Sequence, residues 1–151
     1  MRALIIGAEL LGRALAIDLL DAGHEVRVLD EDADRLAALP SGFGGLALHG
    51  SPLDHATLAN AVDGCDGVAA VSQDDRLNVV AAFAARRELH VPLALAKVAD
   101  PGLAEALHGM GVHVICPTTR TARELLGVLV RSRVESELLL GREVALFRVE
   151  A

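Results

Sequence analysis

Short apolar runs alternate with longer amphipathic stretches over most of the chain. The runs are continuous and rich in Val, Leu, Ile and Ala, which is typical of strands buried on both faces of a parallel sheet. The longer stretches carry apolar residues at helical spacing. The pattern predicts strands at Ala3–Ile6, Val26–Leu29, Leu46–Leu48, Val68–Val71, Leu93–Val98 and Val112–Ile115, and helices at Leu11–Ala22, Asp32–Leu39, Leu53–Val62, Asp75–Leu89 and Leu103–Gly109.

The repeated strand–helix units constrain the topology. Because crossovers between parallel strands are right-handed, they build an open sheet with helices on both faces. We therefore predict an α/β fold, a doubly wound Rossmann-like parallel sheet of about six strands in the order 3-2-1-4-5-6. Ser51-Pro52 and Asp100-Pro101 are each predicted to place a capping side chain before a proline at the first helical position. Ser72 is predicted to cap the helix that follows the fourth strand.

The end of the chain has a different pattern. A longer helix is predicted after Pro117, over 118–140, and "REVALFRVE" after Gly141 indicates one more strand. That strand needs a partner, so it extends a sheet edge, pairs with a second subunit or begins a further domain. The residues expected to pack are Leu125, Leu126, Leu129, Val130 and Val134 on the helix and Val144, Leu146 and Phe147 on the strand.

Composition and charge exclude several classes of function. The formal net charge is −7, and the chain has neither a basic run nor any Trp or Tyr, so we expect no nucleic-acid binding. No apolar run approaches the ~18 residues of a membrane span, and the apolar N-terminus leads directly into a glycine turn. These features predict a soluble, cytoplasmic protein. The cysteines and histidines match no metal-site spacing, so we predict reduced thiols, no metal and no general base.

A glycine loop follows the first predicted strand. Gly7 permits a tight turn, and Gly12 permits close packing of the next helix, whose free N–H groups face any bound anion. The alternative is a Rossmann fold that has lost its ligand. We predict a phosphate-binding loop made of Gly7, Ala8, Glu9, Leu10, Leu11 and Gly12.

The second predicted strand ends in acidic residues. A carboxylate at this place accepts hydrogen bonds from the ribose hydroxyls of an adenosine, and Asp30 is the candidate. Glu31 and Asp32 add negative charge, which argues against a 2′-phosphate and therefore against NADP. The alternative is that Asp30 or Asp32 caps the next helix.

Glu9 stands where a dinucleotide fingerprint has glycine. Its carboxylate adds bulk and a charge that repels phosphate. Three interpretations are open: the side chain interacts with the helix dipole and occupies the anion site from within, it binds a divalent cation that bridges to phosphate, or it is a solvated glutamate beside the cleft.

Further candidates follow the third and fourth predicted strands. Strands 1 and 4 flank the point at which the strand order reverses, where ligands bind in this topology. Polar side chains there are expected to line the cleft, and the alternative is that they cap the next helix. The candidates are Ser51, Pro52, Ser72, Gln73, Asp74 and Asn78.

Four segments together carry a resemblance to a known family: "IIGAELLGRALAIDLLDAGHEVRVLDEDADRL", "GFGGLALHGSPLDHATLANA", "DGVAAVSQDDRLNVVAAFAARR" and "GVHVICPTTRTARELL". They resemble the RCK N-lobe, also called the KTN or TrkA-N domain, of cytoplasmic regulators of potassium channels and Trk/Ktr transporters. The resemblance covers residues 2–130. It implies a Rossmann-like nucleotide-binding domain at 1–117, then a crossover helix and terminal strand at 118–151 that serve in dimerisation.

The resemblance also implies a function. The chain would be a non-catalytic regulatory subunit that senses an adenine nucleotide, NAD(H), ATP, ADP or AMP, and controls a membrane-embedded K⁺ transporter or channel subunit. It would form a homodimer or a larger RCK ring at the inner face of the membrane. By position, Gly7 and Gly12 match the phosphate loop, Asp30 the ribose acid, and Ser72, Asp74, Asp75 and Asn78 the loop after strand 4.

The chain departs from this family pattern at four positions. Glu9 replaces the second glycine, and Leu10 stands where many relatives carry an arginine that meets phosphate. Ser51 replaces an aspartate, and Thr118 replaces a glutamate. A regulatory C-lobe is missing, which predicts either a truncated chain or a stand-alone N-lobe. Two other functions stay open: a ligand-free scaffold that acts by dimerising, and an NAD-dependent oxidoreductase domain.

Overall fold

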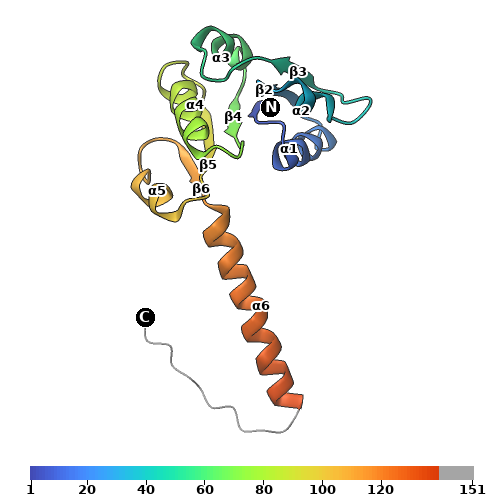
Figure 1. The fold of residues 1–151 in the computed structure, drawn as a ribbon, viewed down its shortest axis with the longest axis vertical. Helices are drawn as coiled ribbons and strands as arrows, with labels where there is room; N and C mark the ends of the chain where they lie inside the picture. The colour runs from blue at the N-terminus through green and yellow to red at the C-terminus, as the bar shows by residue number, and fades with distance from the viewer. Residues whose placement is uncertain (140–151) are drawn as a thin grey trace. The chain divides into compact units, whose positions relative to one another are not determined.

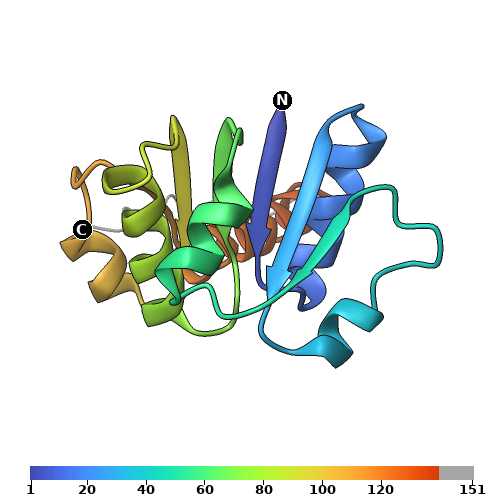
Figure 2. The same ribbon diagram turned by 90° about the horizontal axis from the view of Figure 1, so that it is seen from above.

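The computed structural model describes residues 1–139, in which strands and helices alternate (Figure 1). The strands of this part of the chain form one parallel sheet in the order β3-β2-β1-β4-β5-β6 (Figure 2), which confirms the predicted doubly wound fold. The elements are β1 (Arg2–Ile6), α1 (Leu10–Asp21), β2 (Glu25–Asp30), α2 (Ala33–Ala37), β3 (Leu46–His49), α3 (His55–Val62), β4 (Gly67–Ala70), α4 (Asp75–Arg87), β5 (Leu93–Lys97), α5 (Pro101–Ala106), β6 (His113–Ile115) and α6 (Pro117–Leu139).

Two apolar clusters hold the helices on the sheet. Ile5 of β1 packs with Ala16 of α1 in one cluster, whereas its neighbours Leu4 and Ile6 pack with Leu58 of α3 in the other. Successive side chains of a strand point to opposite faces, so a central strand must be apolar throughout. This requirement explains the continuous apolar runs in the sequence.

The register of the sheet brings three loops to one edge. Ile6, at the end of β1, lies beside Leu29 of β2 on one side and Ala70 of β4 on the other. Because all three strands are parallel, the loops that follow them emerge together. The candidate residues of the glycine loop, the acidic cluster and the β4–α4 loop therefore share this edge.

The helix caps differ from the prediction at two of three positions. Asp100 accepts the Leu103 N–H (2.7 Å) ahead of Pro101 and caps α5, as expected. The predicted Ser51-Pro52 cap is wrong, because α3 begins later and Asp54 caps it. Ser72 is not the cap of α4 either, since Asp74 accepts the first free N–H groups of that helix. A carboxylate one residue before the helix is better placed than a more distant hydroxyl.

The chain divides into two compact units, Met1–Pro117 and Thr118–Ala151. In the second unit the predicted long helix is present as α6, and its apolar residues Leu125, Leu126, Leu129 and Val130 are more than half exposed. The predicted strand at 142–150, with Val144, Leu146 and Phe147, lies outside the described residues. The functions assigned to the two segments stay predictions. No helix among residues 1–139 combines the length and apolarity needed to cross a bilayer.

Candidate functional site

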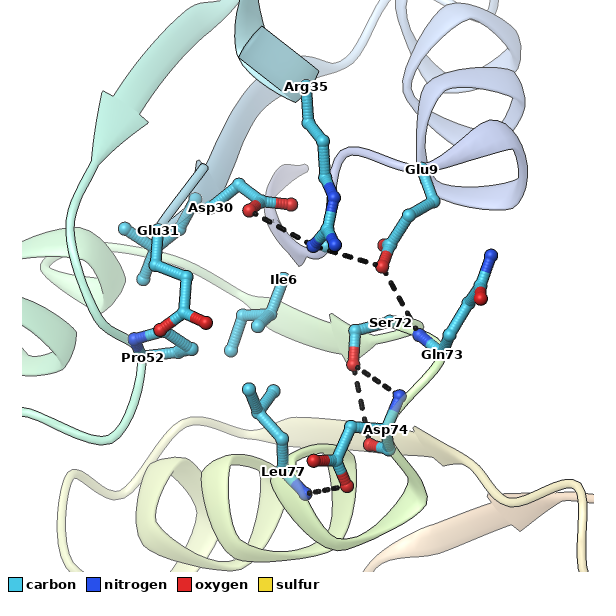
Figure 3. Close-up of a pocket in the computed structure, with 12 residues that line it drawn as sticks. Ile6, Glu9, Asp30, Glu31, Arg35, Pro52, Ser72, Gln73, Asp74 and Leu77 are labelled. Carbon is cyan, nitrogen blue, oxygen red and sulfur yellow. Dashed lines mark hydrogen bonds and ion pairs between the residues drawn. The ribbon is translucent and has the colours of Figure 1, made fainter. Parts of the chain in front are cut away.

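A pocket of about 190 Å³ opens at the edge where the loops after β1, β2 and β4 meet (Figure 3). Eight of its lining residues are sequence candidates: Gly7, Glu9, Asp30, Glu31, Pro52, Ser72, Gln73 and Asp74. The other lining residues are Ile6, Leu29, Leu77 and Arg35.

The glycine turn fits tightly against the neighbouring loop. Gly7 has a φ of +103°, which L side chains rarely adopt, and a Cβ there would lie 2.8 Å from the backbone of Ser72. A Cβ on Gly12 would collide with the carbonyl oxygen of Gly7. Glycine is therefore required at both positions, for the turn and for the approach of α1 to it.

The N-terminus of α1 lacks the cap that the neighbouring helices have. Asp32, Asp54, Asp74 and Asp100 each cap their helix by a side-chain carboxylate, whereas Glu9, at the same place before α1, makes no such hydrogen bond. The first turn of α1 therefore has no side-chain acceptor for its N–H groups. Such a terminus favours a bound anion.

The side chain of Glu9 turns instead toward the pocket. It is 14% exposed, and its Oε1 lies 3.3 Å from Nη1 of Arg35. The same oxygen accepts the Gln73 N–H at 3.4 Å, while Oε2 is buried and has no hydrogen-bond partner. Glu9 therefore faces the cleft, as one interpretation expected, but its side chain is mostly buried and pairs with Arg35. No group of three or more side chains suited to a metal occurs among residues 1–131. The interpretation in which Glu9 binds a cation that bridges to phosphate stays a prediction.

Asp30 is almost fully buried, at 4% exposure, at the end of β2. Its Oδ2 accepts the Ala8 N–H (2.7 Å) and its Oδ1 accepts the Asp32 N–H (2.8 Å). Asp32, not Asp30, caps α2. Asp30 thus ties the glycine turn to the end of β2, and its carboxylate still borders the pocket.

Arg35 of α2 joins the acidic residues of the site. Besides Glu9, its guanidinium lies 3.6 Å from Asp30 Oδ1 and 3.4 Å from Asp32 Oδ2. Figure 3 shows it between the carboxylates of Asp30 and Glu9. One guanidinium pairs with three carboxylates, so the cluster keeps an excess of negative charge. Arg35 was not among the residues predicted from the sequence, although its position one helical turn after the Asp32 cap would have placed it near the strand end.

The β4–α4 side of the pocket is held by internal hydrogen bonds. Asn78 is fully buried: its Oδ1 accepts the Ser72 N–H, and its Nδ2 donates to the carbonyls of Ser72 (2.8 Å) and Lys97 (3.0 Å). It does not line the pocket. Ser72 Oγ accepts the Asp74 N–H at 3.2 Å. These residues shape the loop that forms the wall.

Five other sequence candidates also lie away from the pocket lining: Ala8, Leu10, Leu11, Gly12 and Ser51. Leu10 is 78% exposed and Leu11 is 48% exposed on α1. Ser51 makes a turn, in which its Oγ accepts the Leu53 N–H. Ala8 reaches the site only through its N–H bond to Asp30. In their place Ile6, Leu29 and Leu77 form apolar walls of the pocket. Ile6 and Leu29 lie at the ends of strands and Leu77 in the first turn of α4, and these positions could have indicated them from the sequence.

Comparison with known proteins gives a family match. The model of the family described as "TrkA-N domain" matches residues 3–117. A relative from Streptomyces coelicolor, the Trk system potassium uptake protein TrkA, is 35% identical over 136 residues, which cover 89% of this chain and 61% of the relative. The chain spans between 45% and 66% of the length of the other Trk system relatives that it matches.

Solved structures share the fold. The GsuK channel bound to NAD is 26% identical, with a TM-score of 0.66, over 80% of this chain and 22% of the channel chain. The AMP-bound C-terminal domain of Kef from Shewanella denitrificans is 17% identical, with a TM-score of 0.65, over 95% of this chain and 84% of that domain.

Proposed function

The chain belongs to the TrkA-N domain family, and from this premise we propose that the pocket binds an adenine nucleotide as a regulatory ligand of potassium transport. The observation that carries the proposal is the placement of Asp30. Its buried carboxylate borders a pocket that also contains the Gly7 turn and faces the uncapped N-terminus of α1. This is the arrangement in which a Rossmann fold holds ribose and phosphate together.

Several contacts fit an adenosine. Ile6, Leu29, Pro52 and Leu77 line the pocket with apolar surface, which suits a purine, and the Asp30 carboxylate beside them suits the ribose hydroxyls. The GsuK channel, which shares this fold, is bound to NAD, and this supports a nucleotide ligand. The negative charge around Asp30 favours NAD(H), ATP, ADP or AMP over a ligand with a 2′-phosphate.

We further propose that the nucleotide is an effector of a membrane-embedded K⁺ transporter or channel subunit, not a substrate. The names of the Trk system relatives support this role. The protein would then work in the cytoplasm, at the inner face of the membrane, through its partner. An oxidoreductase would instead oxidise NADH with a small carbonyl substrate, so a turnover assay tests this part of the proposal.

Thermal-shift titration with NADH, NAD⁺, ATP, ADP and AMP tests nucleotide binding. A ligand at one hundred times its Kd adds about 2.7 kcal/mol of stability. Asp30→Asn should abolish the shift, whereas Glu31→Gln, a charge change on the same pocket wall, should retain it. If no nucleotide shifts the wild-type protein at millimolar concentration, the ligand-free scaffold replaces the sensor. That second candidate is favoured by the Glu9–Arg35 ion pair, which already lies in the pocket.

We also propose that the chain forms a homodimer, or a larger RCK ring, through residues 118–151. The exposed apolar residues of α6, Leu125, Leu126, Leu129 and Val130, support this proposal because such a surface is unfavourable in water. Sedimentation equilibrium should give at least a dimer, and Leu126→Glu together with Leu129→Glu should give a monomer. A monomeric wild-type protein at high micromolar concentration would count against dimerisation.

A further inference from the structure

The carboxylate of Glu9 occupies the place where a phosphate is expected. Its Oε2 would lie 2.9 Å from a Cβ on Gly7, so the side chain folds back over the glycine turn. Its Oε1 already accepts a backbone N–H from Gln73 of the β4–α4 loop. Phosphates in Rossmann sites lie over this turn, near the N-terminus of the first helix. An anion of the chain itself is therefore present before any ligand binds.

Arg35 is the single basic residue among those that line the pocket in the described part of the chain. Its side chain is 43% exposed, and it is paired with Glu9 and Asp30. A guanidinium binds carboxylate and phosphate with the same planar set of donors. Leu10, in the glycine loop, is an exposed apolar side chain and offers no cation.

We propose that Glu9 and Arg35 form an internal anion lock on the nucleotide site. An adenosine phosphate binds by displacing the Glu9 carboxylate from Arg35, and the Arg35 guanidinium then contacts the phosphate. Arg35 is thus the phosphate-binding residue, and Glu9 is an intramolecular competitor that lowers affinity. This inference rests on the proposed function, because it requires that the pocket binds an adenine nucleotide.

The lock has a specific signature, because it acts on the phosphate and not on the nucleoside. Adenosine leaves the Glu9–Arg35 pair in place, whereas AMP and ADP must break it. Loss of the competing charge should strengthen the binding of phosphates only. Loss of Arg35 should weaken the binding of phosphates only, since a hydrogen bond to a charged group changes affinity by about tenfold or more.

Isothermal titration of adenosine, AMP and ADP into the whole chain tests the lock. Glu9→Gln should bind AMP and ADP at least about tenfold more tightly than the wild type, and Arg35→Gln at least about tenfold more weakly. Both variants should bind adenosine as the wild type does. In the double variant the gain from Glu9→Gln should be smaller, because there is no Arg35 to release. Circular dichroism and the melting temperature check that each variant is folded.

Glu31→Gln is the matched control. It removes the same charge from the same pocket lining, and no ion pair joins Glu31 to Arg35 among the described residues. The lock is overturned if Glu31→Gln raises AMP affinity as much as Glu9→Gln does, because the effect would then be general electrostatics. It is also overturned if Arg35→Gln leaves AMP binding unchanged or tighter. In both cases adenosine and nucleotides still bind, so the proposed function survives. Absence of binding to every variant would overturn both proposals.

Discussion

Two loops at one edge of the sheet use their polar groups in opposite ways. The β4–α4 loop satisfies its own backbone: Asn78 clamps Ser72, and Asp74 caps α4. The β1–α1 loop leaves α1 without a side-chain cap, and its one acidic side chain, Glu9, pairs with Arg35 from a third element. Both loops carry the residue types of a binding site, but the carboxylate of the second pairs with a neighbouring element and not with its own helix.

The difference shows how to separate structural polar residues from ligand-binding ones. Asn78 uses its amide oxygen and both amide N–H groups within the chain, so it has little left to offer a ligand. Asp30 Oδ2, by contrast, accepts one backbone N–H and keeps a second lone pair. Glu9 has a buried oxygen without a partner, and in the proposed lock its ion pair with Arg35 is exchanged for a phosphate. We therefore expect changes in the β4–α4 loop to act on stability, and changes around Glu9 to act on binding.

The largest effect on stability is expected for Asn78→Ala. A change in nucleotide binding without a loss of stability would contradict the structural role assigned to the β4–α4 loop. The substitution leaves the Ser72 N–H and the carbonyls of Ser72 and Lys97 without partners and opens a cavity. We expect a loss of about 4 kcal/mol in the free energy of unfolding, measured by urea titration. The exposed neighbour Gln73→Ala is the control, with a change within about 0.5 kcal/mol.

Gly7→Ala tests how much the close contact between the glycine turn and the β4–α4 loop contributes to stability. The new Cβ would meet the Ser72 backbone at 2.8 Å, at a φ of +103°. We expect a loss of about 3 kcal/mol, from backbone strain and overpacking together. Gly23→Ala is the matched control, since Gly23 also has a positive φ but has open space around it, and it should lose about 1 kcal/mol. Equal losses would show that the contact between the loops contributes nothing.

Asp74→Ala tests whether Asp74, on the pocket wall, contacts the nucleotide or serves only as the cap of α4. Removal of the cap should cost about 1 kcal/mol of stability, as should Asp100→Ala at α5 outside the pocket. Because Asp74 lies across the pocket from Asp30 and Arg35 (Figure 3) and its Oδ1 accepts two N–H groups of α4, nucleotide affinity should stay within about twofold of the wild type. A tenfold loss of affinity for Asp74→Ala alone would place its carboxylate among the ligand contacts.

The smallest effect concerns Asp54, a capping acid that takes no part in the ion cluster. The Thr57 hydroxyl, and then its backbone N–H, donate to the carboxylate and hold its pKa below the usual range. Because the folded pKa lies below the unfolded one, this carboxylate stabilises the fold above pH ~4, and the effect is lost as the pH falls through the folded pKa. Urea titrations between pH 2 and 7 should show the advantage of wild type over Asp54→Ala shrinking on the acid side. A constant gap would contradict the assignment.

Prediction from the sequence succeeded where the signal was periodic and local. Strand order followed from alternating apolar runs, and Asp30 was placed correctly because a strand end has a defined position in the sheet. It failed at Ser51 and Ser72, because several adjacent polar residues could cap one helix and only backbone geometry selects among them. It also missed Arg35, whose contacts with Glu9 and Asp30 join separate elements.

Hydrophobic periodicity and right-handed crossovers leave few alternatives to the doubly wound sheet, so its topology and the edge at which the candidate residues gather could be predicted from the sequence. The partner of Glu9 could not be predicted in this way, because it depends on how distant elements pack. The charge of a glutamate is a property of the residue, but its partner is set by the approach of α2 to the glycine turn across the end of β2. Because α2 approaches in this way, Glu9, which departs from the glycine of the usual phosphate loop, forms an ion pair with Arg35.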